Sequence, residues 1–157
     1  MVLGSVFSPV LIKADLESEE KEEVFEELVE LYVSQNPSSS RTDLLSSIRM
    51  REEKLSTGVK PGVALPHART EQVDSVVGLI GISKQGIEYD ALDGKPVHII
   101  FMLLSSPNSC ALHLRVLKRL ALLLEDPEFY NNLMTQKDAD GIYNVICKFE
   151  DILATSM

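Results

Sequence analysis

The sequence predicts an α/β fold: a single domain in which a mixed β-sheet is covered by helices on both faces. Apolar runs at residues 63–65, 76–83 and 96–104 indicate strands, and the last run is nearly continuous, as in a strand buried on both faces. The order of two helices, three strands and further helices favours a mixed sheet. The 157 residues suffice for one core but not for two, so we expect residues 1–157 to form one domain.

The first part of the chain is expected to supply an N-terminal arm and two helices. Residues 1–16 carry two short apolar pieces, which indicate an arm or an edge strand packed on the body. Ser18 is the expected N-cap of an amphipathic helix that ends near Ser34, because the acidic residues after it suit the positive end of a helix. Ser40 or Thr42 is expected to cap the second helix.

The last part of the chain is expected to be helical. Residues 111–124 have apolar side chains at strongly helical spacing. Asp126 and Pro127 predict the start of a short helix, because an aspartate caps well and proline fits the first helical position. Asp138 is the expected cap of a final helix that continues through Phe149.

Composition limits the classes of partner. The net charge of −9 argues against nucleic acid, because phosphate backbones bind basic surfaces. Cys110 and Cys147 have neither metal-site spacing nor a CxxC arrangement, so we expect reduced thiols in a reducing compartment. No segment has the roughly 18 apolar residues of a membrane span, and the N-terminus lacks the pattern of a signal peptide. These features predict a cytoplasmic protein without direct membrane insertion.

His67 is the first candidate for chemistry. Loop residues precede a short apolar strand at residues 63–65, and Pro66 ends that strand directly before the histidine. A side chain presented at the end of a strand is well placed for chemistry, because functional residues are commonly held on loops by rigid elements.

The other two histidines differ in their surroundings. His113 starts a helix after a loop that leaves a strand, the place where open α/β sheets bind ligands. His98 lies within the apolar strand and is interpreted as a structural histidine. The sequence contains no HExxH or CxxC motif for a metal, no GxSxG motif of a serine hydrolase and no glycine-rich phosphate loop.

A histidine can itself act as a nucleophile and form a covalent intermediate. Its neutral imidazole is available near pH 7 because its ordinary pKa is about 6.5. A phosphorylated imidazole carries dense negative charge, and an arginine fork is the best match to phosphoryl oxygens. Arg51, which the sequence places in the last turn of a helix, could serve this role or could complement the helix dipole.

The residues around His67 resemble a known family, the type-2 EIIA domains of the bacterial phosphotransferase system. This family includes the fructose, mannitol and nitrogen-regulatory EIIA proteins. The resemblance covers essentially the whole chain. The matching segments are Arg51-Glu52, Ser56-Thr57-Gly58, Gly62-Val63-Ala64-Leu65-Pro66-His67-Ala68, Tyr89-Asp90-Ala91-Leu92-Asp93-Gly94-Lys95-Pro96-Val97, His113-Leu114 and Asp126-Pro127-Glu128-Phe129.

The resemblance implies a type-2 EIIA fold and a phosphotransferase that works through a phosphohistidine. His67 would be the phosphorylated nucleophile and His113 the supporting histidine. Arg51 would stabilise the phosphoryl group, and the hydroxyls of Ser56 and Thr57 are candidates to donate to it. The family's mechanism needs no metal and no organic cofactor, so none is expected here.

The resemblance also implies partners. The phosphoryl donor would be HPr or its nitrogen-branch counterpart, and the acceptor an EIIB domain or a regulatory target protein. The chain contains no EIIB, EIIC or HPr segment, so we expect a free-standing component. The segments at residues 93–97 and at His113 resemble the nitrogen-type members most, which favours a regulatory role.

Three alternatives remain open at this stage. The protein could be a sugar-uptake EIIA of the fructose or mannitol class that donates to an EIIB. It could be a binding regulator that transfers nothing and whose phosphorylation only switches its contacts. It could also be an unrelated acid–base enzyme built on His67 and His113.

Overall fold

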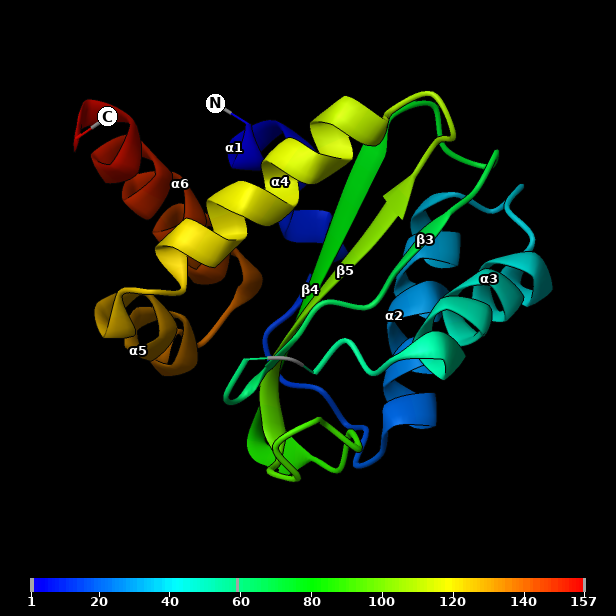
Figure 1. Ribbon diagram of the computed structural model, residues 1–157, viewed down its shortest axis with the longest axis horizontal. Helices are drawn as coiled ribbons and strands as arrows, with labels where there is room; N and C mark the ends of the chain where they lie inside the picture. Colours follow the sequence, from blue (N-terminus) through cyan, green and yellow to red (C-terminus); the bar gives the residue numbers. More distant parts are fainter. Residues whose placement is uncertain (1, 59, 157) are drawn as a thin grey trace.

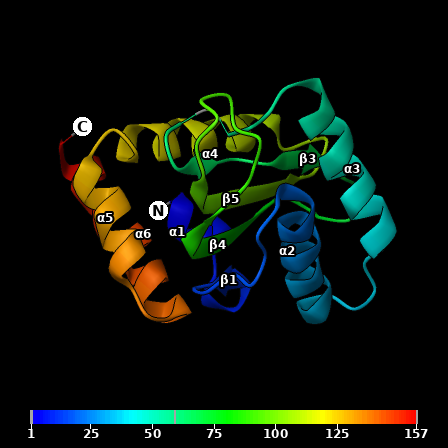
Figure 2. The ribbon, with the colours of Figure 1, turned by 90° about the horizontal axis from the view of Figure 1, so that it is seen from below.

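A mixed β-sheet separates two helical layers (Figures 1 and 2). The computed structural model describes residues 2–58 and 60–156, so Met1, Val59 and Met157 of the predicted domain lie outside the described residues. Within those ranges the sheet has five strands in the order β1-β4-β5-β2, and β3 also pairs with β5. The strands are β1 (Ile12–Lys13), β2 (Val63–Ala64), β3 (His67–Arg69), β4 (Val76–Ile87) and β5 (Val97–Ser105). β4 and β5 are antiparallel and the other pairings are parallel, which confirms the predicted mixed sheet.

The two faces of the sheet carry different helices. One face is covered by α2 (Lys21–Gln35) and α3 (Arg41–Lys54). The other is covered by α1 (Leu3–Val6), α4 (Cys110–Leu123), α5 (Pro127–Thr135) and α6 (Ala139–Ser156), and a 3₁₀ turn (Pro9–Leu11) connects α1 to β1. In the part of the chain that the structure describes, no helix has both the length and the apolarity of a membrane span.

Strand β5 belongs to both cores. Its side chains alternate between the two faces, because successive residues of a strand point to opposite sides. The side chains toward the layer of α2 and α3 are Ile100, Met102 and Leu104, and those toward the opposite layer are Ile99, Phe101 and Leu103. This double burial explains the nearly continuous apolar run in the sequence.

The N-terminal predictions were only partly right. Residues 1–16 include the edge strand β1, but the described part before it forms α1 and the 3₁₀ turn. Ser18 does not cap α2: Glu20 is the cap, in a reciprocal capping box with Glu23, and the Ser18 hydroxyl donates to Glu27 instead. Ser40 does cap α3, since its hydroxyl accepts the third N–H of that helix.

The C-terminal caps were predicted correctly. Asp126 caps α5, whose first residue is Pro127. Asp138 accepts the N–H of Gly141 at 2.8 Å at the start of α6. The last helix continues beyond Phe149 to the end of the described residues.

Strands β2 and β3 form one interrupted edge along β5. Val63 pairs with Ile99, and His67 pairs with Leu103. Pro66 lies between them; it has no N–H, but its carbonyl accepts the N–H of Leu103 at 3.0 Å. The sequence suggested that His67 follows a strand, whereas it is the first residue of β3, because pairing with β5 resumes directly after the proline. Backbone hydrogen bonds of the sheet therefore hold His67.

The first and last helices are joined by a buried carboxylate. Glu150 in α6 is only 1% exposed. It accepts backbone N–H groups from Val2, Leu3 and Gly4 at 2.8–3.2 Å, and Arg119 Nη1 lies 3.4 Å away. A buried carboxylate with this many donors fixes the start of the chain against α6.

Glu150→Ala should lower the free energy of unfolding by about 2–4 kcal/mol, because three N–H groups and Arg119 lose a charged partner. Urea denaturation measures the change. Asp151→Ala, at the exposed neighbouring position on the same helix, is the control and should change the stability little. Equal denaturation midpoints for the two variants would contradict this account of Glu150.

Candidate active site

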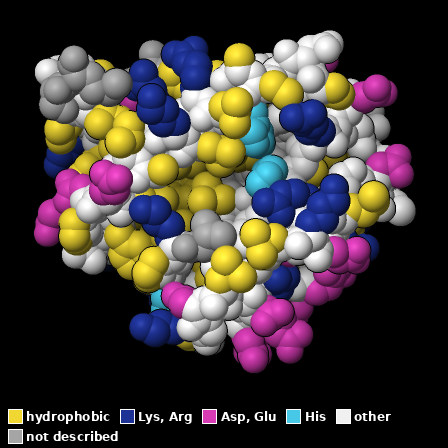
Figure 3. Space-filling view, viewed as in Figure 1, with side chains coloured by type: hydrophobic (Ala, Val, Ile, Leu, Met, Phe, Trp, Pro, Cys, Tyr) yellow, Lys and Arg dark blue, Asp and Glu magenta, His cyan; other side chains and the backbone are white. Residues whose placement is uncertain are grey.

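Arg51, His67 and His113 meet at the carboxyl end of β5. They come from α3, β3 and α4 respectively. Arg51 Nε lies 3.2 Å from His67 Nε2, and the rings of His67 and His113 have centroids 5.2 Å apart at a tilt of 58°. The structure thus brings together the three residues that the sequence singled out. Figure 3 shows histidine side chains at the surface, with Lys and Arg side chains beside them.

Two partners fix the protonation state of the His67 ring. Its Nδ1 lies 2.9 Å from the carbonyl oxygen of Leu65, which can only accept a hydrogen bond. Its Nε2 faces Arg51 Nε, which can only donate. Both contacts require the same neutral tautomer, with the proton on Nδ1 and a lone pair on Nε2.

The surroundings of His67 also favour the neutral ring. Burial lowers the pKa of His67 below its ordinary value, and the charge of Arg51 adds to that decrease. The hydrogen bond to Leu65 and the charge of Glu52 oppose the decrease without reversing it. The ring therefore keeps its lone pair at neutral pH.

His113 is held by the end of β5. Its Nδ1 lies 2.5 Å from the hydroxyl oxygen of Ser105, the last residue of that strand. Burial lowers the pKa of His113, and the neighbouring His67 and Arg69 lower it further. Two neutral imidazoles thus face each other at the site. Sequence reasoning missed Ser105, because only the fold places that strand end beside His113.

The contacts of Arg51 confirm its interpretation as a helix-end residue, and its role toward a phosphoryl group stays a prediction. Arg51 lies in the last turn of α3, and its Nη1 donates to the carbonyl oxygen of Leu55 at 2.9 Å, so it complements the helix end. Its Nε still reaches His67. One guanidinium can make both contacts because it presents five N–H donors in a planar fork.

The structure does not place Ser56 and Thr57 on the cleft at His67. Thr57 is 3% exposed, and its N–H and hydroxyl both bind the carboxylate of Glu52, at 2.9 and 2.6 Å. The hydroxyl of Ser56 accepts the N–H of Gly58, and Ser56 lines a separate pocket. Their role as phosphoryl donors stays a prediction that this arrangement does not favour.

The cleft beside His67 has a volume of about 440 Å³ and a positive lining. It is lined by Ser47, Met50, Arg51, Lys54, His67, Ala68 and Arg69. This lining contains three cations and no carboxylate, in a chain whose net charge is −9. Such a cleft suits an anionic group.

Lys54 and Arg69 were not identified from the sequence. Arg69 could have been identified from its spacing to His67, because residues two apart on a strand lie on the same side. Arg69 therefore shares the side of His67, while Ala68 between them is buried in the core under α2 and α3.

His98 lies apart from these residues and has a structural contact. Its Nδ1 is 2.9 Å from the carbonyl oxygen of Ser83 in β4. Across residues 2–58 and 60–156, no group of three or more His, Cys, Asp or Glu side chains could hold a metal ion.

Comparison with known proteins shows the family. Residues 5–148 match the family model described as "Phosphoenolpyruvate-dependent sugar phosphotransferase system, EIIA 2". The fructose-specific EIIABC component of Bacillus subtilis is 36% identical over 146 residues, which are 93% of this chain and 23% of that protein. The nitrogen regulatory protein of Bradyrhizobium diazoefficiens is 29% identical over 147 residues, 93% of this chain and 95% of that protein. The chain thus spans about a quarter of the first relative and nearly all of the second.

Solved structures agree in fold. The crystal structure of nitrogen regulatory protein IIA-Ntr from Neisseria meningitidis has a TM-score of 0.84 at 32% identity, covering 92% of this chain and 99% of that one. The complex of mannitol enzyme IIA with phosphorylated enzyme IIB from Escherichia coli has a TM-score of 0.73 at 16% identity, covering 90% and 99%. This second likeness shows the fold alone. From the match over residues 5–148, we conclude that the chain belongs to the EIIA type 2 family of the phosphoenolpyruvate-dependent sugar phosphotransferase system.

Proposed function

We propose that this protein accepts a phosphoryl group on Nε2 of His67 and passes it on, or uses it as a regulatory signal. The observation that carries the proposal is the pair of contacts of the His67 ring, from Nδ1 to the carbonyl of Leu65 and from Nε2 to Arg51 Nε, which together leave a lone pair on Nε2. Phosphoryl-group transfer is the role of the family at large, and the phosphohistidine on His67 is the step that we add.

The proposed step needs no proton transfer within the site. The Nε2 lone pair forms a bond to phosphorus as the bond between phosphorus and the donor's ring nitrogen breaks. The proton on Nδ1 stays in place, because the carbonyl oxygen of Leu65 holds it. Catalysis then rests on positioning and on charge stabilisation, which are the main demands of phosphoryl transfer.

In this proposal Arg51, His113 and Lys54 support the phosphoryl group. Arg51 would move its Nε–H donor from Nε2 of His67 to a phosphoryl oxygen, keeping its contact with Leu55. If the Ser105 hydroxyl donates to Nδ1 of His113, the other ring nitrogen of His113 carries a proton to donate to a second phosphoryl oxygen. Lys54 adds a positive charge on the cleft.

For partners, we propose HPr or nitrogen-branch HPr as the donor and an EIIB domain or a regulatory protein as the acceptor. A nitrogen-regulatory role is favoured, because this chain covers 95% of the nitrogen regulatory protein of Bradyrhizobium diazoefficiens and 99% of the IIA-Ntr chain of Neisseria meningitidis. The alternative is sugar uptake, which the 36% identity to the fructose-specific component supports. Transfer from the phosphorylated protein to a fructose or mannitol EIIB separates these roles, and failure to transfer to any acceptor would favour a purely binding regulator.

We further propose that residues 1–157 act as one domain in the cytoplasm. The described residues pack on a single sheet, in two cores that share its strands. Cys110 and Cys147 are free thiols, in keeping with a reducing compartment.

Incubation with enzyme I, HPr and phosphoenolpyruvate should label the protein with an acid-labile, base-stable phosphate. His67→Ala should abolish the label, because the nucleophile is gone. His98→Ala is the matched control and should keep it, since Nδ1 of His98 contacts the carbonyl of Ser83 and His98 does not line the cleft at His67. Full labelling of the His67→Ala protein would disprove the assignment.

Arg51→Lys should slow labelling by about 10- to 100-fold, because the substitution keeps the charge but loses the fork that binds both Leu55 and the phosphoryl group. The circular dichroism spectrum should stay unchanged. The control is Arg49→Lys, two residues earlier on α3, whose guanidinium pairs with Glu22. Equal rates for the two variants would remove Arg51 from the site.

The His67 ring should titrate below the ordinary value of about 6.5 in ¹⁵N NMR, because burial and the charge of Arg51 disfavour the imidazolium. Arg51→Gln should raise the pKa of His67, whereas Arg49→Gln should leave it unchanged. The labelling rate should fall with acidification only below the ordinary histidine range. A pKa that does not rise in Arg51→Gln would contradict this electrostatic account.

A further inference from the structure

Glu52 is a buried carboxylate that the proposed mechanism does not use. It follows Arg51 on α3 and is 7% exposed. Its oxygens contact the N–H and hydroxyl of Thr57, the Lys21 ammonium at 3.0 Å and the Tyr89 hydroxyl at 3.2 Å. A carboxylate buried to this degree needs such partners, and here they come from three separate parts of the chain.

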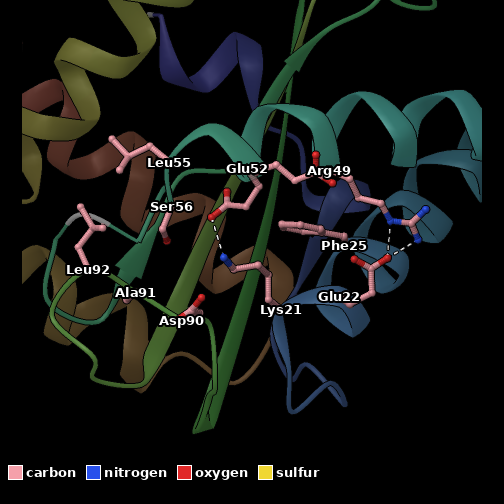
Figure 4. A pocket seen from close by; sticks show the side chains of 11 residues that line it. Lys21, Glu22, Phe25, Arg49, Glu52, Leu55, Ser56, Asp90, Ala91 and Leu92 are labelled. Carbon is pink, nitrogen blue, oxygen red and sulfur yellow. Dashed lines mark hydrogen bonds and ion pairs between the residues drawn. The ribbon is translucent and has the colours of Figure 1, made fainter.

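Figure 4 shows where this cluster lies. Lys21 reaches toward Glu52 across one side of a pocket of about 570 Å³ between α2, α3 and the segment at residues 90–92. Leu55 and Ser56, which follow α3, form another part of its wall. The carboxylate therefore ties the end of α3 to the start of α2 and to the loop that leads on to the active site.

A chain of hydrogen bonds leads from Glu52 to His67. Glu52 holds the N–H and hydroxyl of Thr57. The carbonyl of Thr57 accepts the N–H of Leu65 at 3.1 Å. The carbonyl of Leu65 is the acceptor for Nδ1 of His67 at 2.9 Å. The His67 ring is thus three hydrogen-bonded steps from the buried carboxylate, and the third step is the contact that sets its tautomer.

The same loop also supports Arg51. The carbonyl that receives Arg51 Nη1 belongs to Leu55, two residues before Thr57. The loop is closely packed at Gly58: a Cβ there would lie 2.8 Å from Cβ of Ala91, and the carbonyl of Gly58 accepts the N–H of Leu92. The position of Thr57 therefore bears on both acceptors, the carbonyl of Leu55 for Arg51 and the carbonyl of Leu65 for His67.

Resting on the proposed function, we infer that Glu52 is a positioning residue for phosphoryl acceptance: through Thr57 and Leu65 it keeps the lone pair of His67 on Nε2. A neutral imidazole whose Nδ1 has no fixed acceptor carries its proton on either nitrogen. Molecules with the proton on Nε2 have no lone pair there and cannot accept a phosphoryl group at that atom. A displaced loop would also deprive Arg51 of its acceptor.

The test measures the tautomer and the rate separately. ¹⁵N NMR of the His67 ring, without any phosphoryl donor, should show the Nδ1–H form in the wild type and a mixture of both forms in Glu52→Ala. Labelling by the phosphorylated carrier should slow about tenfold or more, the effect of one misplaced hydrogen bond of ordinary strength, with KM for the carrier unchanged. Glu52→Gln should restore most of both properties, because its amide oxygen still accepts the N–H of Thr57.

Two further variants separate positioning from general stability. Thr57→Val keeps the shape of the residue but loses one of the two contacts with Glu52, and should shift the tautomer and the rate partway. Tyr89→Phe removes the hydroxyl that contacts both Glu52 and Thr57 but leaves the two hydrogen bonds between Glu52 and Thr57 in place, and should keep the tautomer of the wild type.

The inference is overturned if Glu52→Ala keeps the pure Nδ1–H tautomer and the wild-type rate. Should Glu52→Ala not fold, wild-type values in Thr57→Val would overturn it equally. A wild-type protein that takes up no phosphoryl group contradicts the proposed function, whereas the NMR result tests the link from Glu52 to the His67 ring by itself.

Discussion

The hydrogen bond from Nδ1 of His67 to the carbonyl of Leu65 is the contact on which the site depends. It exists because Leu65 lies at the edge of the sheet. The carbonyls of Gly62 and Pro66 face β5 and accept the N–H groups of Ile99 and Leu103. The carbonyl of Leu65, one residue before Pro66, points to the other side and meets a side chain two residues later. Backbone groups on the outer side of an edge strand have no strand to pair with. Here such an acceptor orients a ring.

The site joins the two layers of the fold. Arg51 comes from the layer of α2 and α3, and His113 from the layer that contains α4, while His67 lies on the strand edge between them. Neither layer contains the site by itself. Packing on both faces of β4 and β5 therefore sets the distances between the three side chains, and the rigid strands maintain those distances.

The sequence predicted the fold class, the strands at the centre of the sheet and the caps at Asp126 and Asp138, and it offered Ser40 or Thr42 as the cap of the second helix, because local patterns determine them. It missed side-chain contacts that only the folded chain reveals. Ser18 is of a residue type that often caps helices, but its hydroxyl donates to Glu27, and Glu20 is the N-cap of α2.

The candidate site shows the same division. The motif around His67 and the spacing to Arg51 named residues that the structure brings together. The sequence did not reveal that the hydroxyl of Thr57 donates to Glu52. Both are polar residues near the end of a helix, and only the fold shows that they are buried together. A surface hydroxyl and a buried one look alike in a sequence.

The carboxylate of Glu150 places the first and last helices side by side, and α1 and the last turns of α6 lie in the same region of Figure 1, away from β3 and α3. A polypeptide joined before α1 and another joined after α6 would therefore leave from one corner of the molecule. Such a unit can be inserted into a longer chain, or given a tag at either end, while the cleft at His67 stays open to a docking protein. The contact between Glu150 and the first described residues thus makes the domain suited to fusion at either end.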